Sequence, residues 1–330
     1  MKTKNVRLKE IALDLNVSIN TVSRALRDCS DVSKETKEKV MRKAIEYGYM
    51  PNIIAQSLKN DDRKCIAIVL SRFRNLLFNS LSEICGNLLL KAGYDFTIIY
   101  TMKPKIDVDC IKRCISQRVD GIIAFSDLDK ESVEYAKYNN IVLIFSGIPK
   151  ITQNFSIVHT DDEGGSYLAA NYLMNYHGLE NFLYIGYRGN KNSNIRYESF
   201  KKCILKQKPK ANVNYLEYDP NNFLNKVNIL DYIIDDKLGI YVFNDETVYD
   251  FLEKINIKFP NFRKMFPGVH IVGFDCLSTR IKGLIDITSI DNDYESYCKA
   301  MLDIFEKSFK DKKYLAAIPI KTTLHQRIYK

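Results

Sequence analysis

The feature that most constrains this chain is an alternation of short apolar runs and amphipathic segments that begins at Cys65. Runs rich in β-branched and aromatic residues predict strands, and the 3.6-residue periodicity between them predicts helices, among them 76–92, 165–176 and 223–235. Such alternation indicates parallel sheets that are covered by helices on both faces. The expected strands form two series, which indicates two doubly wound sheets: 65–71, 94–100, 121–125, 142–146 and 157–160, then 182–186, 213–218, 238–243 and 269–274, with short strands at 288–290 and 316–320.

Residues 6–48 follow a different pattern, which predicts three short helices and no strand. The first helix has apolar residues from Leu8 to Leu15 on one face, and a turn at Asn16-Val17-Ser18 ends it. Ser18 is expected to cap a second helix that runs to about residue 27. Ser33 is expected to cap a third helix, which Gly48 ends and whose inward residues should be Val40, Ala44 and Ile45.

The first two of these helices have the packing logic of a helix-turn-helix. The second presents polar residues near its amino end, and such a helix fits the major groove of DNA. Asn20 and Arg24 are candidate base readers, because Asn pairs with adenine and Arg pairs bidentately with guanine. The hydroxyls of Ser18, Thr21 and Ser23 suit phosphate oxygens, which position a protein without specifying a sequence. On these residues alone, a generic three-helix bundle with solvated polar faces stays open.

Charge and composition narrow the class of protein. Residues 1–64 hold 14 Lys and Arg against 9 Asp and Glu, so this segment carries most of the net charge of +9 and suits a polyanionic partner. No stretch approaches the roughly 20 apolar residues that span a bilayer, and the basic start has no apolar signal-peptide core. We therefore expect a cytoplasmic protein without a membrane partner. The eight scattered cysteines form no Cys-x-x-Cys pair, which indicates free thiols rather than a metal site.

Residues 6–58 strongly resemble the lactose-repressor (LacI/GalR) family of bacterial transcription regulators, and the rest of the chain resembles it more loosely. The matching positions are Ile11-Ala12, Val17-Ser18, Thr21-Val22-Ser23-Arg24, Val32-Ser33-Lys34-Glu35-Thr36, Val40, Tyr47-Gly48-Tyr49-Met50-Pro51-Asn52, Ala55 and Leu58. Arg7 departs from the family, which usually has a helix-capping Thr there. An arginine at that place can reach a phosphate instead.

The resemblance implies specific contacts with double-stranded operator DNA. Positions matching Ile19, Asn20 and Arg24 read the major groove in the family. The segment from Asn52 through Ala55 to Leu58 would form a hinge helix that orders on the operator. Leu58 would insert into the minor groove, where an apolar wedge unstacks a base step and bends the duplex. The family also implies a homodimer on a near-palindromic operator, with one head for each half-site.

The resemblance implies a body like that of periplasmic sugar-binding proteins, whose two lobes are joined by three crossovers and hold a ligand between them. The expected domains are a helix-turn-helix head (1–50), a hinge helix with linker (51–63) and an effector-binding core (64–330). Within the core we expect a first lobe of about 65–157 and 288–320, and a second lobe of about 161–286 and 321–330.

Three second-lobe residues, Arg196, Asn244 and Asp275, match the family's effector contacts, although an ion pair or a helix cap is the alternative for each. Their side chains suit sugar hydroxyls, so we expect a sugar-like small-molecule effector. The first lobe should contribute Phe73, Asn75, Leu77, Phe125, Ser126 and Ser146. The family commonly has Asn-Pro-Phe-Phe at residues 75–78 and often Asp at 146, so the effector of a relative cannot be transferred to this chain.

These features predict a sequence-specific transcription regulator, a repressor by the family's usual outcome, with no cofactor and no catalytic role. Whether its effector induces or corepresses stays open. The alternatives are a solute-binding receptor and a cytoplasmic sugar-binding or sugar-converting protein with a basic head. Against an enzyme, the sequence has no Gly-x-Ser-x-Gly elbow, phosphate-binding glycine loop or metal cluster, and its four histidines (159, 177, 270, 325) are far apart along the chain.

Overall fold

The computed structural model divides the chain into two compact units, residues 1–63 and 64–330. It describes residues 8–26, 29–49, 64–71, 75–149, 155–221 and 228–327. The expected hinge helix lies outside these ranges. So do five expected contact residues, which are Arg7, Asn52, Ala55, Leu58 and Phe73. Within the described ranges, no helix is both long enough and apolar enough to cross a membrane.

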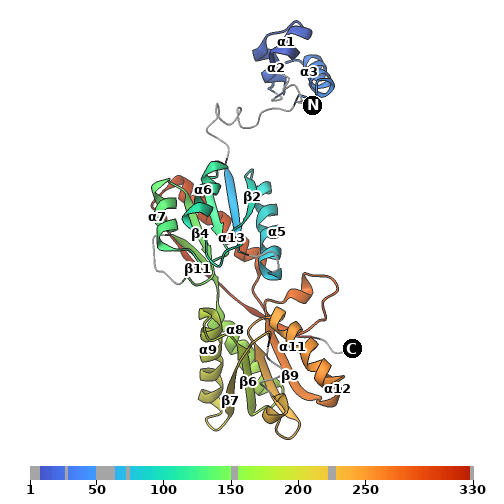
Figure 1. Cartoon of the computed structure of the whole chain (residues 1–330), viewed down its shortest axis with the longest axis vertical. Helices are drawn as coiled ribbons and strands as arrows, with labels where there is room; N and C mark the ends of the chain where they lie inside the picture. The colour runs from blue at the N-terminus through green and yellow to red at the C-terminus, as the bar shows by residue number, and fades with distance from the viewer. Residues whose placement is uncertain are drawn as a thin grey trace. The chain divides into compact units, whose positions relative to one another are not determined.

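The first unit is the expected three-helix head, with α1 (Leu8–Asp14), α2 (Ile19–Leu26) and α3 (Lys34–Glu46) (Figure 1). Its core consists of Ile11, Ala12, Val22, Ala25, Val40 and Ala44. The Ser18 and Ser33 hydroxyls accept the N–H groups of residues 21 and 36, which confirms both caps. The expectation for Ile45 is wrong. It is 74 % exposed, because each residue turns about 100° around a helix and Val40 and Ala44 already define the buried side.

The first lobe of the second unit contains a six-stranded sheet in the order β11-β5-β4-β3-β1-β2 (Figure 1). Every neighbouring pair is parallel. The central strands β1 and β3 are buried along their whole length, as strands covered on both faces must be. The strands are β1 (Cys65–Leu70), β2 (Asp95–Tyr100), β3 (Gly121–Ala124), β4 (Val142–Ser146), β5 (Ser156–Thr160) and β11 (Ala317–Ile320).

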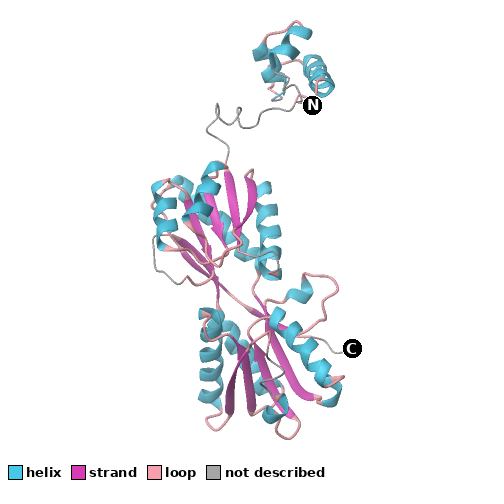
Figure 2. Cartoon of the chain, in the orientation of Figure 1, coloured by secondary structure: helices cyan, strands magenta, loops and turns pink. Residues whose placement is uncertain are grey.

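Helices cover both faces of this sheet (Figure 2). One hydrophobic core lies between the sheet and the helices α5 (Leu76–Lys91) and α13 (Tyr294–Lys310). A separate core lies on the other face, beneath α6 (Val108–Ser116) and α7 (Lys130–Tyr138). This is the doubly wound arrangement that the sequence predicts.

The second lobe repeats the plan with the strand order β12-β10-β9-β8-β6-β7, in which only β12 is antiparallel to its neighbour. The helices α8 (Asp162–Asn171) and α9 (Lys191–Gln207) cover one face, and α11 (Asp245–Lys258) and α12 (Phe262–Met265) cover the other. The strands are β6 (Asn181–Gly186), β7 (Asn212–Glu217), β8 (Lys237–Val242), β9 (Gly268–Phe274), β10 (Thr288–Asp291) and β12 (Thr323–His325).

Two expectations about the second lobe need correction. The strand at 288–290 was assigned to the first lobe, but β10 pairs with β9 through Thr288 and Val272, so it belongs to the second. The helix expected over 223–235 does not reach its predicted end, because the described part has a 3-10 turn at Ile229–Tyr232 and then a bridge from Ile234 to Lys237. Asp235 and Asp236 adopt left-handed φ values of 49° and 59°, which turn the chain into β8.

The chain passes between the lobes three times, from β5 to α8, from β10 to α13 and from β11 to β12. Each passage leaves the carboxyl end of a strand. Ligands of doubly wound sheets bind at these ends, so the topology places a candidate site between the lobes. The lobes are in contact there, since the Glu246 Oε1 atom on α11 accepts the Leu76 N–H of α5 at 2.6 Å.

Candidate functional site

Helix α2 of the head presents a polar face with one exposed apolar residue. Ile19 is 48 % exposed and Asn20 is exposed, whereas Val22 and Ala25 face the core. The turn before α2 depends on Asn16, whose φ of 49° is left-handed, and on a hydrogen bond from the Val17 N–H to the Ala12 carbonyl. The amino end of α2 is therefore held rigidly and open to solvent, as a major-groove reader requires.

The candidate base reader Arg24 is ion-paired in the head. Its Nε donates to Asp31 Oδ1 at 3.2 Å, and its Nη2 lies 2.5 Å from Asp31 Oδ2. The hydrogen bond from Arg24 lowers the pKa of the Asp31 carboxyl, which stays ionised. Since both side chains are largely exposed, this fork orients the guanidinium while leaving it open to a competing acceptor. Sequence reasoning missed Asp31, which lies in the loop after α2.

The body has a cavity of about 270 Å³ where the two lobes meet. Its described lining comes from both lobes and from the passage between β10 and α13: Asn75, Leu77, Phe78, Leu81, Ser146, Gly147, Thr160, Asn190, Asn192, Arg196, Phe243, Asn244, Asp275, Asn292, Tyr294 and Tyr297. Amides, hydroxyls and aromatic rings predominate, and Arg196 and Asp275 are the only charged members of this set. This composition suits a small ligand with many hydrogen-bonding groups.

Arg196 is buried, and two of its three guanidinium nitrogens donate hydrogen bonds to the protein. Its Nε donates to Asp162 Oδ1 at 2.7 Å, and its Nη1 donates to the Phe243 carbonyl at 2.5 Å. The guanidinium carbon lies 3.4 Å from the ring centre of Phe274. Burial disfavours the cation, but the carboxylates of Asp162 and Asp275 outweigh it and raise the pKa of Arg196. The cavity therefore has a cation that is already neutralised.

Asp275 is 2 % exposed and follows β9 with a φ of 98°, a value rare for any residue other than glycine. Its Oδ1 accepts from Asn292 Nδ2 at 3.0 Å, and its carbonyl accepts from the Tyr294 hydroxyl at 2.6 Å. Burial raises the pKa of Asp275 to about 7, although Arg196 and Asn292 oppose the shift. A strained, buried carboxyl with a shifted pKa is typical of a binding site.

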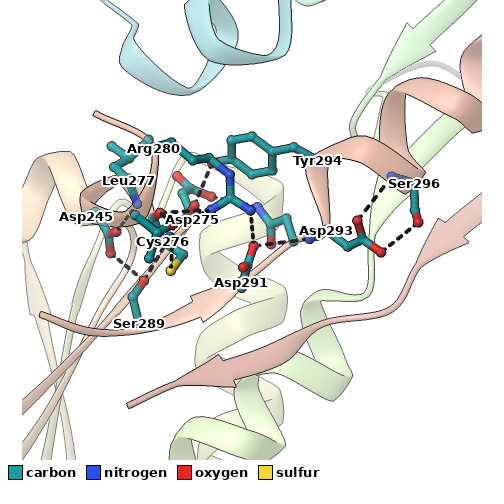
Figure 3. A network of polar contacts seen from close by, with 12 residues as sticks. Asp245, Asp275, Cys276, Leu277, Arg280, Ser289, Asp291, Asp293, Tyr294 and Ser296 are labelled. Atoms are coloured by element: carbon teal, nitrogen blue, oxygen red, sulfur yellow. Dashed lines mark hydrogen bonds and ion pairs between the residues drawn. The ribbon is translucent and has the colours of Figure 1, made fainter. Parts of the chain in front are cut away.

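A polar network fixes the loop that carries Asp275 (Figure 3). The buried Asp245 accepts from the Ser289 hydroxyl at 2.7 Å and from the Leu277 N–H at 2.8 Å. On the other side of the loop, Arg280 bonds Asp291 at 2.5 Å and stacks 3.9 Å from the ring centre of Tyr294. The loop after β9 is thus attached both to the second lobe and to the start of α13 in the first lobe.

The first-lobe wall is built around Tyr297. Its hydroxyl donates to the Val158 carbonyl at 2.6 Å and lies 3.0 Å from the Ser146 Oγ atom. Since the single Tyr297 proton is used on Val158, the Ser146 hydroxyl donates to the tyrosine oxygen. Asn75 caps α5 through the Phe78 N–H, and Asn244 caps α11 through the Thr247 N–H. Both asparagines are helix caps that also line the cavity.

Six of the nine expected effector residues line this cavity: Asn75, Leu77, Ser146, Arg196, Asn244 and Asp275. Phe125 and Ser126 are not in the described lining. Phe125 is 2 % exposed, and its ring centre lies 5.1 Å from that of Phe78, which does line the cavity. The ninth residue, Phe73, is outside the described residues. The role of the six in binding an effector stays a prediction.

Sequence reasoning missed several lining residues, notably Asn192, Asn292 and Tyr294, and it missed Asp162 beneath them. Asp162 accepts from both Arg196 and Asn192, the latter at 2.6 Å. Asp162, Asn292 and Tyr294 all follow within four residues of a strand end, at β5 or β10. The carboxyl ends of parallel strands meet at one edge, so polar residues at these positions were an available signal.

Comparison with known proteins gives a consistent picture. The family model "Bacterial regulatory proteins, lacI family" matches residues 7–52. The chain is 23 % identical over 322 residues to the HTH-type transcriptional repressor PurR of Vibrio parahaemolyticus, covering 93 % of each protein. Alignments to some other curated regulators span only 51 to 62 % of those proteins.

Two solved structures share the whole fold. One is a lac repressor dimer bound to operator and the anti-inducer ONPF, with a TM-score of 0.75, 18 % identity and 98 % of both chains covered. The other is a complex of the transcriptional regulator CelR with cellobiose, with a TM-score of 0.63, 19 % identity, and 98 % of this chain and 99 % of that one covered. At these identities the likeness shows the fold.

Proposed function

Because the chain belongs to the lacI family of bacterial regulatory proteins, we propose that its head binds operator DNA and that its cleft binds a small effector controlling transcription. The observation that carries this proposal is the separation of two unlike sites on one chain. A helix with an exposed Asn20 and a partly exposed Arg24 lies in a unit of its own, and a polar cavity lies between the lobes of the other unit.

The charges of the cavity favour an uncharged, sugar-like effector. The Arg196 cation is neutralised by Asp162, so an anionic ligand would meet no free positive charge among the described lining residues. Asparagine amides and the Asp275 carboxyl provide donors and acceptors for hydroxyl groups. The rings of Phe78, Phe243 and Tyr294 provide apolar surface for the C–H face of a sugar ring.

In this proposal the protein is a homodimer that binds a near-palindromic operator and represses a target promoter. It acts in the cytoplasm, where the chromosome lies. Two heads in fixed spacing read two half-sites, and effector binding changes the relation of the lobes and hence of the heads. The coupling free energy in such systems is typically about 1–3 kcal/mol. The protein acts by binding and not as an enzyme.

Selection from random duplexes by the full-length protein tests the DNA-binding function. We expect enrichment of one near-palindromic sequence, and Arg24→Ala should abolish that preference without unfolding the protein.

Leu58→Ala should weaken specific binding more than nonspecific binding. Recovery of no enriched sequence, with or without candidate effectors, would refute the proposal.

A thermal-shift screen tests the effector class separately, because a ligand that binds only the folded cleft raises the melting temperature by mass action. Neutral sugars should raise it, whereas their phosphate esters should not. Turnover of any of these sugars by the purified protein would overturn the assignment as a non-enzyme.

A further inference from the structure

A second cavity lies in the first lobe, at the opposite end of the sheet from the cleft. Its volume is about 470 Å³, larger than the cleft. It is bounded by the amino ends of β4 and β5 and by residues at the carboxyl ends of α7 and α13. No residue of the effector cleft takes part in it, so it is a separate feature of the lobe.

The inner surface of this cavity is apolar. Val133, Leu143 and Phe155 line it and are each less than 10 % exposed. Leu315 lines it as well and is 52 % exposed. A ligand with an apolar body would cover Leu315 and gain the free energy of removing this surface from water.

The rim of the cavity is cationic. Lys137 of α7 and the neighbouring Lys312 and Lys313, just beyond α13, all line it and are exposed. No aspartate or glutamate is among its described lining residues, and none of the three lysines forms an ion pair with another described residue. Two segments distant in sequence thus bring three positive charges to one opening, and the nearby Asp311 carboxylate, whose Oδ1 atom accepts the Lys313 N–H at 2.9 Å, offsets part of this charge.

The cavity also contains a polar group that lacks a partner. Ser308, in the last turn of α13, is 3 % exposed, and its Oγ atom makes no hydrogen bond within the described part of the chain. Buried hydroxyls are nearly always hydrogen-bonded in folded proteins. Because this Oγ atom is closed to solvent, it lies behind the surface of the cavity, and the proposed site does not depend on it.

We infer that this cavity is a second small-molecule site, which takes an organic anion consisting of an apolar body and one carboxylate or phosphate group. The apolar body fills the region around Val133, Leu143 and Phe155, and the anionic group lies at the rim among the lysines. This site is independent of the proposed effector cleft, whose charges favour an uncharged ligand.

Calorimetric titration of the full-length protein with 4-phenylbutyrate tests the inference. We expect a dissociation constant below about 1 mM, a modest affinity for a ligand of this size. Acetate carries only the charge and benzyl alcohol only the apolar body, so each should bind at least about tenfold more weakly. Failure of 4-phenylbutyrate to bind by about 10 mM, or equal binding of benzyl alcohol, would overturn the inference.

Charge-reversal variants locate the site. The double variant Lys312→Glu/Lys313→Glu should weaken 4-phenylbutyrate about tenfold, because it replaces two attractive exposed charges with repulsive ones. The control Lys91→Glu/Lys105→Glu makes the same change in net charge at exposed lysines outside the cavity and should leave binding unaltered. If both pairs weakened 4-phenylbutyrate binding equally, the effect would come from the net charge of the protein, and the location of the site would be refuted.

Two further variants keep the result unambiguous. Leu315→Glu changes one exposed residue at the mouth and should weaken binding while circular dichroism shows an unchanged fold. Asp275→Asn alters the effector cleft and should leave 4-phenylbutyrate binding unchanged. Weakening by Asp275→Asn together with no effect of the lysine pair would place the probe in the cleft and refute a second site.

Discussion

At the scale of single residues, the pairing of Arg24 with Asp31 has a consequence for DNA recognition. The carboxylate holds the guanidinium fork in one orientation, and a fixed fork can match the two acceptors of guanine. The same carboxylate repels phosphates, so it disfavours contacts that carry no sequence information. Asp31 should therefore sharpen selectivity, although it contributes no base contact of its own.

We predict that Asp31→Asn tightens binding to random duplex DNA and lowers the ratio of specific to nonspecific affinity about tenfold, the scale of one bidentate base contact. Competition binding at fixed salt measures this ratio. Glu35→Gln is the matched control, since Glu35 is also exposed and ion-paired in the head, but with Lys39. A ratio that changes equally in both variants would assign the effect to net charge.

Asp275 makes effector binding dependent on pH. Its pKa of about 7 means that the carboxyl is ionised at pH 8 and mainly protonated at pH 6. Ionised carboxylates accept stronger hydrogen bonds from hydroxyl groups. We expect affinity for an uncharged effector to fall by up to about tenfold from pH 8 to pH 6, measured by calorimetry. Asp275→Asn should remove this slope, and persistence of the slope in that variant would contradict the prediction.

His177 should make the stability of the second lobe depend on pH. Its ring stacks on His270 with the centres 3.4 Å apart, and burial, with a contribution from His270, lowers the pKa of His177 to about 4. Unfolded histidine titrates near about 6.5. Between about pH 6.5 and pH 4, His177 is protonated in the unfolded chain but stays neutral in the folded one. The free energy of unfolding is therefore highest above about pH 6.5 and falls toward pH 4. Denaturant titrations at pH 7, 5.5 and 4.5 should show this loss, and a His177→Phe variant should show less of it.

At the scale of secondary-structure elements, the end of β9 leaves no room for a side chain at Gly273. A Cβ atom on Gly273 would lie 2.1 Å from Asp245 Oδ1, inside the network that fixes the Asp275 loop. We predict that Gly273→Ala lowers the free energy of unfolding by about 2–3 kcal/mol, as overpacking of a rigid buried site does. Gly189→Ala is the control, because nothing lies within 4 Å of its Cβ position. Similar denaturation midpoints for the two variants would count against this interpretation.

Most helices and strands were predictable because the spacing of apolar residues within each one indicates its type. Both sheets, the serine caps of the head and six of the sixteen residues that line the cavity follow from pattern and resemblance. The lobe to which β10 belongs did not, since a four-residue strand has no local signal for its partner. Phe125 was misplaced for a related reason. Its position just after β3 is visible in the sequence, but only the folded structure shows that it is buried against Phe78 and outside the described lining of the cavity.

Ion-pair partners were the least predictable part of the candidate site. Asp162 lies 34 residues before Arg196, and Asp31 lies seven residues after Arg24 across a turn. The helix that contains Arg24 ends at Leu26, before Asp31, and a separation of 34 residues spans several elements, so no helix or strand pattern connects the members of a pair. Both partners depend on tertiary structure, and both alter what the predicted binding residue can do.

At the scale of the whole molecule, a hydrogen bond made by Glu246 is one of the contacts that join the two lobes. The Glu246 carboxylate bonds the first N–H of α5 across the cleft, where the positive end of that helix dipole favours an anion. We predict that Glu246→Gln increases the rate of effector release about fivefold, as loss of a partly exposed charge-assisted bond would. Stopped-flow dissociation measures this rate. Glu253→Gln, an exposed position on the same helix, should leave it unchanged, and equal rates in both variants would exclude the contact as a determinant.

The last strands of the chain have a consequence for protein synthesis. Both β11 and β12 belong to the final segment, and they complete the edges of two different sheets. A ribosome therefore releases the three-helix head long before either lobe has its full set of strands. A nascent chain with a finished head but an unfinished body could occupy DNA without responding to a metabolite. Premature termination near residue 316 would produce such a product, so completion of β11 and β12 during translation bears directly on regulatory control.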